Sequence, residues 1–283
     1  MEDELTPDVP FDEVTILQQG EINHAATVPV FDANGMDGYQ LSWNDDAIIR
    51  QFISYGMGCI MGRYSTDKSG LILASQGETE EDYYKKVYGC EKDSVAADKF
   101  CIDDDGIVPL MSINNELTDN AALSFKRWLE STLGSETLVE NLNTIQQILG
   151  KNIETYFQKE FWKEHKRRYQ NRPIYWLFSS KKGAFQCLVY MHRMDAYTPE
   201  RIRTRYLLPH IDWLRRKKAE LDERSAMLTG PERKELDSIN KQIDECLEYH
   251  DRLHTVADAQ QPINLDDGVV ANYAKFGSVV SKL

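Results

Sequence analysis

The sequence has few cysteines, and it has no long hydrophobic run. Its five cysteines are widely spaced and form no C-x-x-C pair, so a closed disulfide framework and a zinc ribbon are both excluded. The longest apolar stretch, residues 52–61, is far shorter than the ~20 residues of a membrane span, and the N-terminus is acidic where a signal peptide is basic. We therefore expect a protein of the reducing cytoplasm with no membrane partner.

The motifs of several enzyme classes are also missing. The chain has no G-x-x-x-x-G-K-[ST] loop for a nucleoside triphosphate, no glycine-rich turn of the kind that binds dinucleotides or S-adenosylmethionine, and no G-x-S-x-G nucleophile motif. No constellation of carboxylates and lysine suits two-metal nuclease chemistry. The sequence therefore predicts no catalytic residue and no cofactor site in this chain.

Two patterns contain residue types that bind metals, and each has a simpler explanation. The run DDDG at residues 103–106 offers carboxylates, but the spacing and the closing glutamate of a calcium loop are missing. Cys246, His250 and His254 lie at i, i+4 and i+8, as zinc ligands on one helical face would. Cys246 and His250 also occupy an apolar helical seam, so packing accounts for both. We expect an acidic solvated turn and no metal site.

The charge is unevenly distributed along the chain. The protein has 283 residues and a formal net charge of -13, which argues against a simple basic nucleic-acid-binding protein. Residues 1–150 contain 9 basic and 27 acidic side chains, whereas residues 151–218 contain 17 basic and 6 acidic ones. Such asymmetry suggests separate surfaces with separate partners.

Composition and periodicity predict an α+β fold that is mainly α-helical. Its helical domain contains a small β-hairpin and is followed by a long antiparallel, coiled-coil-like helical hairpin. Hydrophobic residues at 41% suffice for a packed core. The predicted parts are an extended acidic arm (1–43), an acidic mixed α/β part (44–115), a helical part (116–197) with a β-hairpin at 173–192, the antiparallel helical hairpin (198–258) and a docked C-terminal tail (259–283).

Local signals predict most of the helices and strands. Asn44 and Thr79 are typical N-caps, and Gly134 and Gly150 are typical helix stops. Three glycines in the first helix suggest close packing against its backbone. We also expect helices over 119–133, 136–149 and 153–169. Strands are expected at 71–74, at 107–111 and on either side of the turn SKKG at residues 180–183.

The helical hairpin follows a helix start at Thr198-Pro199-Glu200. Apolar residues then recur at spacings of four and three on both sides of the turn at residues 229–231. Pro209 lacks an amide hydrogen, so we expect a kink or break near it. The predicted seam contains Leu207, Ile211, Leu214, Lys218, Leu221, Ser225 and Leu228 in the first arm and Leu236, Ile239, Ile243, Cys246, His250, Leu253 and Ala257 in the second.

The basic segment is the main candidate for a functional surface. Lysine and arginine neutralise phosphates and supply most of the affinity for nucleic acid, and here they alternate with aromatic residues. The opposing interpretation is an ordinary charged face that pairs with the acidic first half of the same protein. The candidate DNA-binding residues are Lys163, Lys166, Arg167, Arg168, Arg172, Lys181, Lys182 and Arg193.

Several long runs resemble one protein family, in the same order along almost the whole chain. They are DELTPDVP (3–10), GCIMGRYS (58–65), GLILA (70–74), YFQK (156–159), KRRY (166–169), RPIYWLFSS (172–180), LVYMHR (188–193), LDDGV (265–269) and NYAKF (272–276). Together they resemble the C-terminal region of the PglX family, the adenine-specific DNA methyltransferases of BREX phage-defence systems.

This resemblance implies a role in site-specific N6-adenine methylation of DNA in a prokaryotic cytoplasm. The S-adenosylmethionine glycine motif and the Asn-Pro-Pro-Tyr tetrapeptide of the family occur nowhere here, so no catalytic residue carries over. We expect a C-terminal fragment or a separately encoded C-terminal piece that is inactive alone, with S-adenosylmethionine bound by the parent enzyme. Its implied partners are DNA, the rest of the methyltransferase and other BREX proteins. The alternative is a protein-interaction scaffold that does not contact DNA.

Overall fold

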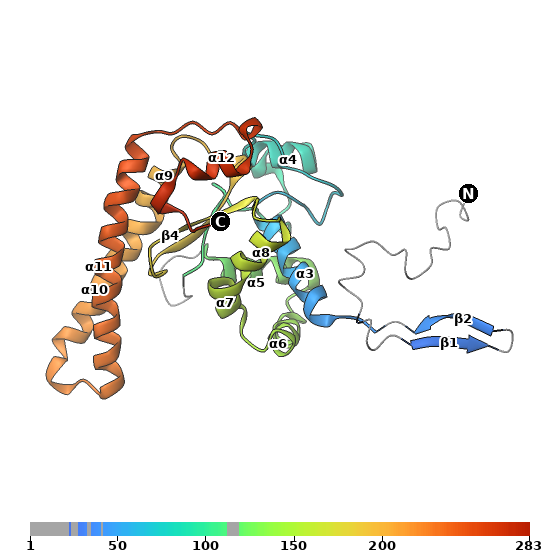
Figure 1. Cartoon of the computed structure of the whole chain (residues 1–283), viewed down its shortest axis with the longest axis horizontal. Helices are drawn as coiled ribbons and strands as arrows, with labels where there is room; N and C mark the ends of the chain where they lie inside the picture. The colour runs from blue at the N-terminus through green and yellow to red at the C-terminus, as the bar shows by residue number, and fades with distance from the viewer. Residues whose placement is uncertain (1–22, 24–27, 33–34, 41, 112–118) are drawn as a thin grey trace.

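A small antiparallel sheet lies at the centre of a mainly helical α+β fold, which confirms the predicted fold class (Figure 1). The computed structural model describes residues 23, 28–32, 35–40, 42–111 and 119–283. The strand order of the central sheet is β3-β5-β4. Its strands are β3 (Ile107–Pro109), β4 (Tyr175–Ser179) and β5 (Gln186–Tyr190).

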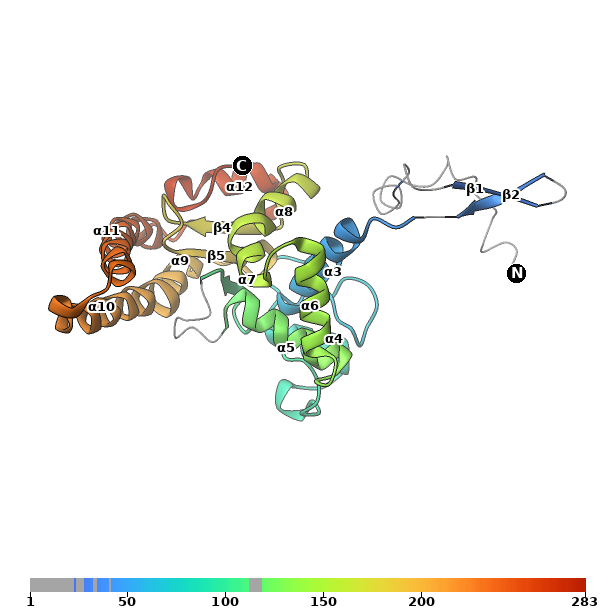
Figure 2. The ribbon, with the colours of Figure 1, turned by 90° about the horizontal axis from the view of Figure 1, so that it is seen from below.

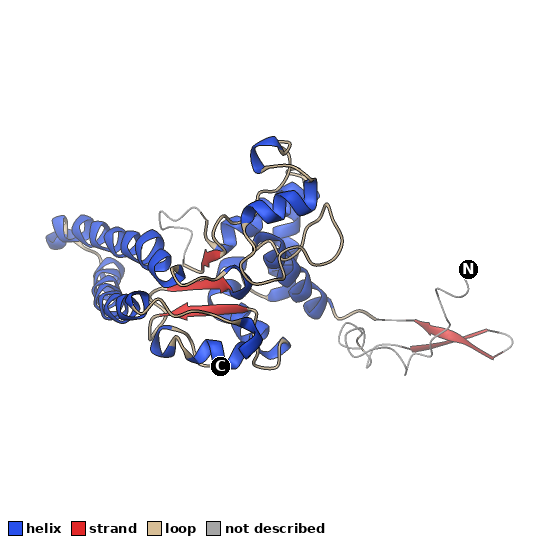
Figure 3. Cartoon of the chain, turned by 90° about the horizontal axis from the view of Figure 1, so that it is seen from above, coloured by secondary structure: helices blue, strands red, loops and turns tan. Residues whose placement is uncertain are grey.

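Helices surround this sheet on both sides in Figure 3. Two of them are continued by π-helical segments, η3 after α7 and η5 after α9. The helical elements are α3 (Asp45–Ile60), α4 (Glu80–Tyr88), α5 (Ala121–Leu133), α6 (Leu138–Leu149), α7 (Ile153–Tyr156), η3 (Phe157–Phe161), α8 (Trp162–Arg168), α9 (Thr198–Arg201), η5 (Ile202–Leu207), α10 (Leu208–Glu223), α11 (Gly230–Asp258) and α12 (Val269–Ala274), with short 3-10 turns between several of them.

The helix starts follow from side-chain caps. Asn44 accepts the amide hydrogen of Ala47 at the start of α3. Thr79 and Asp82 form a capping box on α4, and Thr229 and Glu232 form another on α11. Each cap satisfies amide groups that the first helical turn leaves without partners, so the predicted starts of α3 and α4 are confirmed.

Strand β4 is buried on both faces, and alternate side chains contact different elements. Trp176 and Phe178 face the C-terminal tail, where their rings pack on Phe276 at centroid distances of 5.7 and 5.5 Å. Tyr175 points the other way and stacks on His165 of α8 at 4.6 Å. Since side chains alternate along a strand, β4 joins two separate halves of the core.

The C-terminal tail covers the outer edge of β4. Val280 forms an antiparallel bridge with Phe178, and the amide of Ser281 donates to the carbonyl of Leu177 at 2.8 Å. Figure 2 shows α12 beside β4, on the side away from α5 and α6. An open edge strand exposes unpaired backbone groups, so the tail both fills the core and closes this edge.

The glycines of α3 allow the close packing that the sequence predicts. A β-carbon on Gly56 would lie 2.6 Å from the ring of Trp128, which is closer than packed atoms approach. A β-carbon on Gly58 would overlap the ring of Tyr64. Glycine weakens a helix interior by roughly 1 kcal/mol relative to alanine, and here the close contact with aromatic rings offsets that cost.

Helices α10 and α11 form the antiparallel hairpin that the sequence predicts, and its far half projects from the body (Figure 1). On α11 the seam differs from the prediction, because Tyr249 is fully buried and His250 is not. Tyr249 donates its hydroxyl hydrogen to the carbonyl of Val279 at 2.8 Å. The docked tail therefore shifts the buried face of α11 by one residue. Lys218 and Ser225 of the predicted seam also lie outside the core.

The helix does not break near Pro209 but widens just before it. Residues Ile202–Leu207 form a π-helical segment, and the amide of Leu208 donates to the carbonyl of Arg203. Pro209 then lies in the first turn of α10, where its missing amide hydrogen costs little. The helix thus continues past the proline by widening one turn.

One prediction about strands is wrong, and two strands were not predicted. Residues 71–74 form no strand, because the amides of Ile72 and Leu73 donate to the carbonyls of Arg63 and Gly62 at the end of α3. Within the predicted extended arm, β1 (Val28–Asp32) and β2 (Gly35–Gln40) pair as antiparallel strands. Its register shifts at Val30/Phe31, which breaks the strict alternation that a sequence pattern would show. Residues 1–22 of the predicted arm lie outside the described residues.

Candidate nucleic-acid interface

Five of the eight candidate cations lie on α8 or in the turn that follows it. We call Lys163, Lys166, Arg167, Arg168 and Arg172 the α8 basic cluster. Lys163 and Arg167 are one helical turn apart, and both are exposed, as are Arg168 and Arg172. The cations of the last turn also suit the negative end of the helix macrodipole, so the cluster stabilises α8 whether or not it contacts a ligand.

A buried histidine fixes this helix end against the sheet. His165 Nε2 accepts the amide hydrogens of Ile174 at 3.2 Å and Tyr175 at 3.1 Å. Burial, with a smaller contribution from the charge of Arg168, lowers the pKa of His165 to about 3. The ring is therefore neutral at pH 7 and can act as an acceptor. Sequence reasoning did not identify this residue, since nothing local distinguishes it from a surface histidine.

A left-handed turn sets the position of Arg172. Gln170 and Asn171 have φ angles of 51° and 62°, a conformation that asparagine tolerates better than most residues. The amides of Gln170, Asn171 and Arg172 donate to the carbonyls of Arg167, Lys166 and Tyr169. The turn thus places Arg172 beside the end of α8 and leads directly into β4.

Most of the α8 basic cluster is free of ion pairs. Among the described residues, no carboxylate lies within 4.0 Å of Lys163, Arg167, Arg168 or Arg172. Lys166 differs, because its amine lies 4.9 Å from the ring centroid of Trp162 and donates to the carbonyl of Lys282 at 3.3 Å. Four cations of the cluster are thus available to an external anion, and Lys166 holds the tail.

Lys181 and Lys182 lie at the other end of β4, on the tip of the β4–β5 hairpin. Strand β4, which is five residues and roughly 16 Å long at about 3.3 Å per residue, lies between them and the α8 basic cluster. The tip is held by Glu245 of α11, whose Oε1 accepts from the Ser180 hydroxyl at 2.6 Å and from the amides of Lys182 at 2.5 Å and Ala184 at 3.3 Å. These donors, aided by the charge of Lys182, lower the pKa of Glu245 against the effect of burial.

We expect Glu245→Ala to detach the hairpin tip from α11 and to lower the free energy of unfolding by about 1–2 kcal/mol. The reason is that three hydrogen-bond donors lose a charged acceptor, which water replaces only in part. Urea denaturation followed by circular dichroism measures this. Glu248→Ala, one turn further on the exposed side of α11, is the matched control and should change stability by less than about 0.5 kcal/mol. Equal effects of the two variants would contradict the anchoring role.

Arg193 was predicted to bind DNA, but the structure buries it. Its side chain is 9% exposed, and its guanidinium donates to the backbone carbonyls of Asp103 at 2.7 Å and Asp104 at 2.6 Å. A guanidinium that satisfies carbonyl groups inside the protein cannot reach a phosphate outside it. The sequence does not show that Arg193 is buried, because the carbonyl acceptors lie about 90 residues away along the chain.

The other arginines of the basic segment are paired internally. Arg201 bridges to Asp195 at 2.9 Å, Arg203 to Glu200 at 2.7 Å, and Arg205 to Asp104 and Asp105 at 2.9 and 2.7 Å. The two interpretations of the basic segment therefore apply to different parts of it. The end of α8 presents free cations, whereas Arg201 and Arg203 pair within their own segment and Arg205 pairs with aspartates of the first half.

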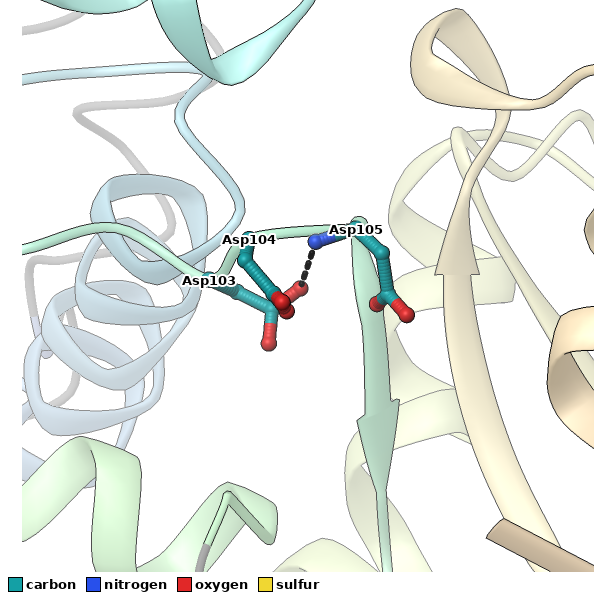
Figure 4. A group of neighbouring side chains, drawn as sticks. All are labelled: Asp103, Asp104 and Asp105. Carbon is teal, nitrogen blue, oxygen red and sulfur yellow. Dashed lines mark hydrogen bonds between the residues drawn. The ribbon is translucent and has the colours of Figure 1, made fainter. Parts of the chain in front are cut away.

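The acidic run at 103–105 is a turn bound by its own backbone (Figure 4). One carboxylate oxygen of Asp103 accepts from the amides of Asp105 at 3.3 Å, Gly106 at 2.6 Å and Ile107 at 3.1 Å. Ligand oxygens of the three aspartates lie within 4.8 Å of one another. Burial raises the pKa of Asp103 well above its usual value, as does the neighbouring charge of Asp105, while Arg193 lowers it.

The three residues with zinc-ligand spacing do not converge among the described residues. Cys246 is buried in the seam. His250 contacts Arg203 through Nε2 at 3.1 Å and Asp251 through Nδ1 at 3.3 Å, and His254 Nδ1 lies 2.9 Å from Asp258. Each histidine ring thus contacts a neighbouring charged side chain.

Within the described part of the chain, no helix is both long and apolar enough to cross a membrane.

The fold and this surface define a class of protein: a mainly helical α+β region whose small sheet is closed by its own tail, and which presents a cluster of free cations beside that sheet. No protein-family model matches the chain. The adenine-specific methyltransferase BrxX of Escherichia coli O9:H4 (strain HS) is 38% identical to it over 254 residues, 82% of this chain and 20% of that protein. The adenine-specific methyltransferase PglX of Lacticaseibacillus casei (strain Zhang) is 36% identical over 242 residues, 80% of this chain and 19% of that protein.

These relatives confirm the resemblance to the C-terminal region of the PglX methyltransferases of BREX phage defence. The chain spans about a fifth of the length of the two curated relatives.

Proposed function

We propose that this chain is a non-catalytic C-terminal region of a site-specific adenine-N6 DNA methyltransferase of a BREX system, acting in a prokaryotic cytoplasm. In this proposal S-adenosylmethionine and the reacting adenine bind to the parent enzyme, and this region helps to hold the DNA. The supporting observation is the α8 basic cluster, which has four exposed cations without ion pairs among the described residues. Lysine and arginine in this arrangement contact phosphates and therefore position the duplex without reading its sequence.

The rigid base of the cluster favours this role over a merely solvated face. His165, the left-handed turn and β4 hold the end of α8 in one position, so little ordering is needed when a phosphate binds. Lys181 and Lys182, at the opposite end of β4, are proposed as a second phosphate contact. Other BREX proteins and the rest of the methyltransferase are the proposed protein partners.

The triple variant Lys163→Ala/Arg167→Ala/Arg168→Ala tests DNA contact. Each lost phosphate contact lowers the slope of log affinity against log salt by about 0.9, so we expect the slope to fall by about 2–3 and binding at low salt to weaken by at least tenfold. Fluorescence anisotropy with a labelled duplex across a salt series measures both quantities.

The matched control is Arg215→Ala/Lys217→Ala/Lys218→Ala on α10. It removes the same charge from residues that pair with Asp212, Glu220 and Asp222. A wild-type chain that binds no duplex at low salt, or two triple variants with equal slopes, would overturn the proposed contact.

A second candidate function is a protein-interaction scaffold that does not contact DNA. The observation in its favour is the projecting half of the α10–α11 hairpin, which ends in Met227 with 86% of its surface exposed. Loss of partner capture after truncation of this hairpin end, with unchanged DNA affinity, would support the scaffold function.

A further inference from the structure

A cavity of about 220 Å³ lies where four elements meet, away from the α8 basic cluster. Gln158 of η3, Gln186 of β5, His210 and Trp213 of α10 and Gln242 of α11 line it. The remaining described residues of its wall are small or aliphatic, with one methionine, and none carries a charge. Such a wall disfavours an ionic ligand, because a charge would lose hydration without gaining a counter-charge.

The three glutamines leave hydrogen-bonding groups unused. The amide nitrogen of Gln186 donates to the Ser179 hydroxyl at 3.2 Å, and that of Gln242 donates to the Ser238 hydroxyl at 3.1 Å. Their carbonyl oxygens have no donor among the described residues, and the side chain of Gln158 has no partner there. The cavity therefore offers both donors and acceptors to a ligand.

His210 adds part of an aromatic wall. Its Nε2 lies 3.0 Å from the carbonyl of Ala184 and so carries the hydrogen, whereas Nδ1 is buried below the surface of the cavity and has no partner among the described residues. Burial lowers the pKa of His210 to about 4, so the ring is neutral at pH 7. Its plane is stacked with that of Trp213 at 15° and a centroid distance of 5.9 Å.

The cavity shares Gly183, Ala184 and Gln242 with a wider open groove of about 590 Å³. Lys181, Lys182 and Lys241 line that groove, and among the described residues no carboxylate lies within 4.0 Å of any of these three amines. The groove also contains Asp244, Glu245 and Glu248, of which Glu245 is occupied by the hairpin tip. A neutral cavity thus adjoins a groove in which three lysines without ion pairs lie near three carboxylates.

We propose that the cavity binds a nucleobase and that the attached sugar and phosphate lie in the groove beside Lys181, Lys182 and Lys241. A nucleobase is flat, uncharged and rich in donors and acceptors, glutamine pairs with adenine through two hydrogen bonds, and an indole face stacks on any base. The volume is below that of a drug-sized site and suits one ring system. A free mononucleotide and an unpaired nucleotide in DNA share this chemistry.

The experiment titrates the full chain with adenosine monophosphate, and separately with a duplex that contains one unpaired 2-aminopurine and with the same duplex fully paired. Calorimetry follows the mononucleotide, and 2-aminopurine fluorescence follows the unpaired base. We expect Trp213→Leu to weaken binding about tenfold or more through lost stacking, and Gln242→Leu to weaken it about fivefold. Gln147→Leu on the exposed side of α6 is the matched control, and circular dichroism verifies that each variant is folded.

Binding of the mononucleotide that both cavity variants weaken supports the proposal with a free nucleotide as the source. Binding of the unpaired base alone, weakened in the same way, supports it with DNA as the source. Absence of both signals, or binding that Trp213→Leu and Gln242→Leu leave unchanged, would overturn it. This inference goes beyond the proposed phosphate contact at α8. The Lys163→Ala/Arg167→Ala/Arg168→Ala variant distinguishes the two proposals, because it should weaken binding of the paired duplex and leave the affinity for the mononucleotide unchanged.

Discussion

Trp176→Ala is expected to lower the free energy of unfolding by about 3–5 kcal/mol, the usual cost of removing a large buried aromatic side chain. Trp176 is 0% exposed, and its ring packs on Tyr273 at 5.2 Å and Phe276 at 5.7 Å. Its indole nitrogen also donates to the carbonyl of Pro173 at 3.1 Å. The substitution leaves a cavity between β4 and the tail, so the tail should detach before the rest of the chain unfolds.

Urea denaturation measures the stability loss, and limited proteolysis measures release of the tail. New cleavage sites after residue 259 are expected in the variant under conditions that leave the native chain intact. Trp43→Ala is the control, because Trp43 is 56% exposed and should change stability by less than about 0.5 kcal/mol. A tail that stays as resistant as in the native chain would show that contacts other than Trp176 hold it.

Acidification from pH 7 to pH 5 is expected to destabilise the fold through His165 and His210. Burial lowers the pKa of these rings to about 3 and about 4, whereas the unfolded value is about 6.5. The unfolded state then binds more protons, so the stabilising contribution of each ring is complete above pH 6.5 and is lost as pH falls towards the folded pKa. Each ring accounts for a loss of about 2 kcal/mol by pH 5.

A comparison of variants separates the pH dependence due to the two histidines from that due to the acidic residues. Asp103 and Asp105 have raised pKa values, mainly through burial, and contribute with the opposite sign, since a raised carboxyl pKa makes the fold more stable as pH falls. Urea denaturation at pH 7, 6 and 5 should therefore show a smaller pH dependence in His165→Gln and in His210→Gln than in the native chain, by about 2 kcal/mol each over this range. Equal pH dependence in all three proteins would contradict the burial of neutral rings.

Local sequence signals predicted the elements that short-range contacts create. The caps at Asn44 and Thr79 and the glycine stop at Gly134 act within one helical turn. The β4–β5 hairpin and the α10–α11 hairpin each combine a turn with the matching periodicity. The predicted strand at 71–74 is wrong because it depended on a longer-range contact: Ile72 and Leu73 are buried, as the pattern indicates, but their amides bond to Arg63 and Gly62 after α3 and not to a neighbouring strand.

The candidate interface was predicted only in part. Residue type and spacing identified the cluster at α8, yet they could not distinguish Arg168, which is exposed and unpaired, from Arg193, which is buried among the carbonyls of the aspartate turn. The boundaries of the five predicted parts stay predictions. The glutamine-lined cavity had no sequence signal at all, because Gln158, Gln186 and Gln242 come from three separate elements.

The sequence by itself determined the mainly helical class, most helix starts and stops, the two hairpins and the resemblance to the methyltransferase C-terminal region. Only the tertiary structure decided that β3 pairs with β5, that the tail closes the edge of β4, that Tyr249 replaces His250 in the seam, and which cations are free. The physical reason is the distance along the sequence between the residues that interact. Caps, turns and periodicity act between residues a few positions apart, whereas the exposure of a charge depends on which distant carboxylates and carbonyls the fold brings beside it.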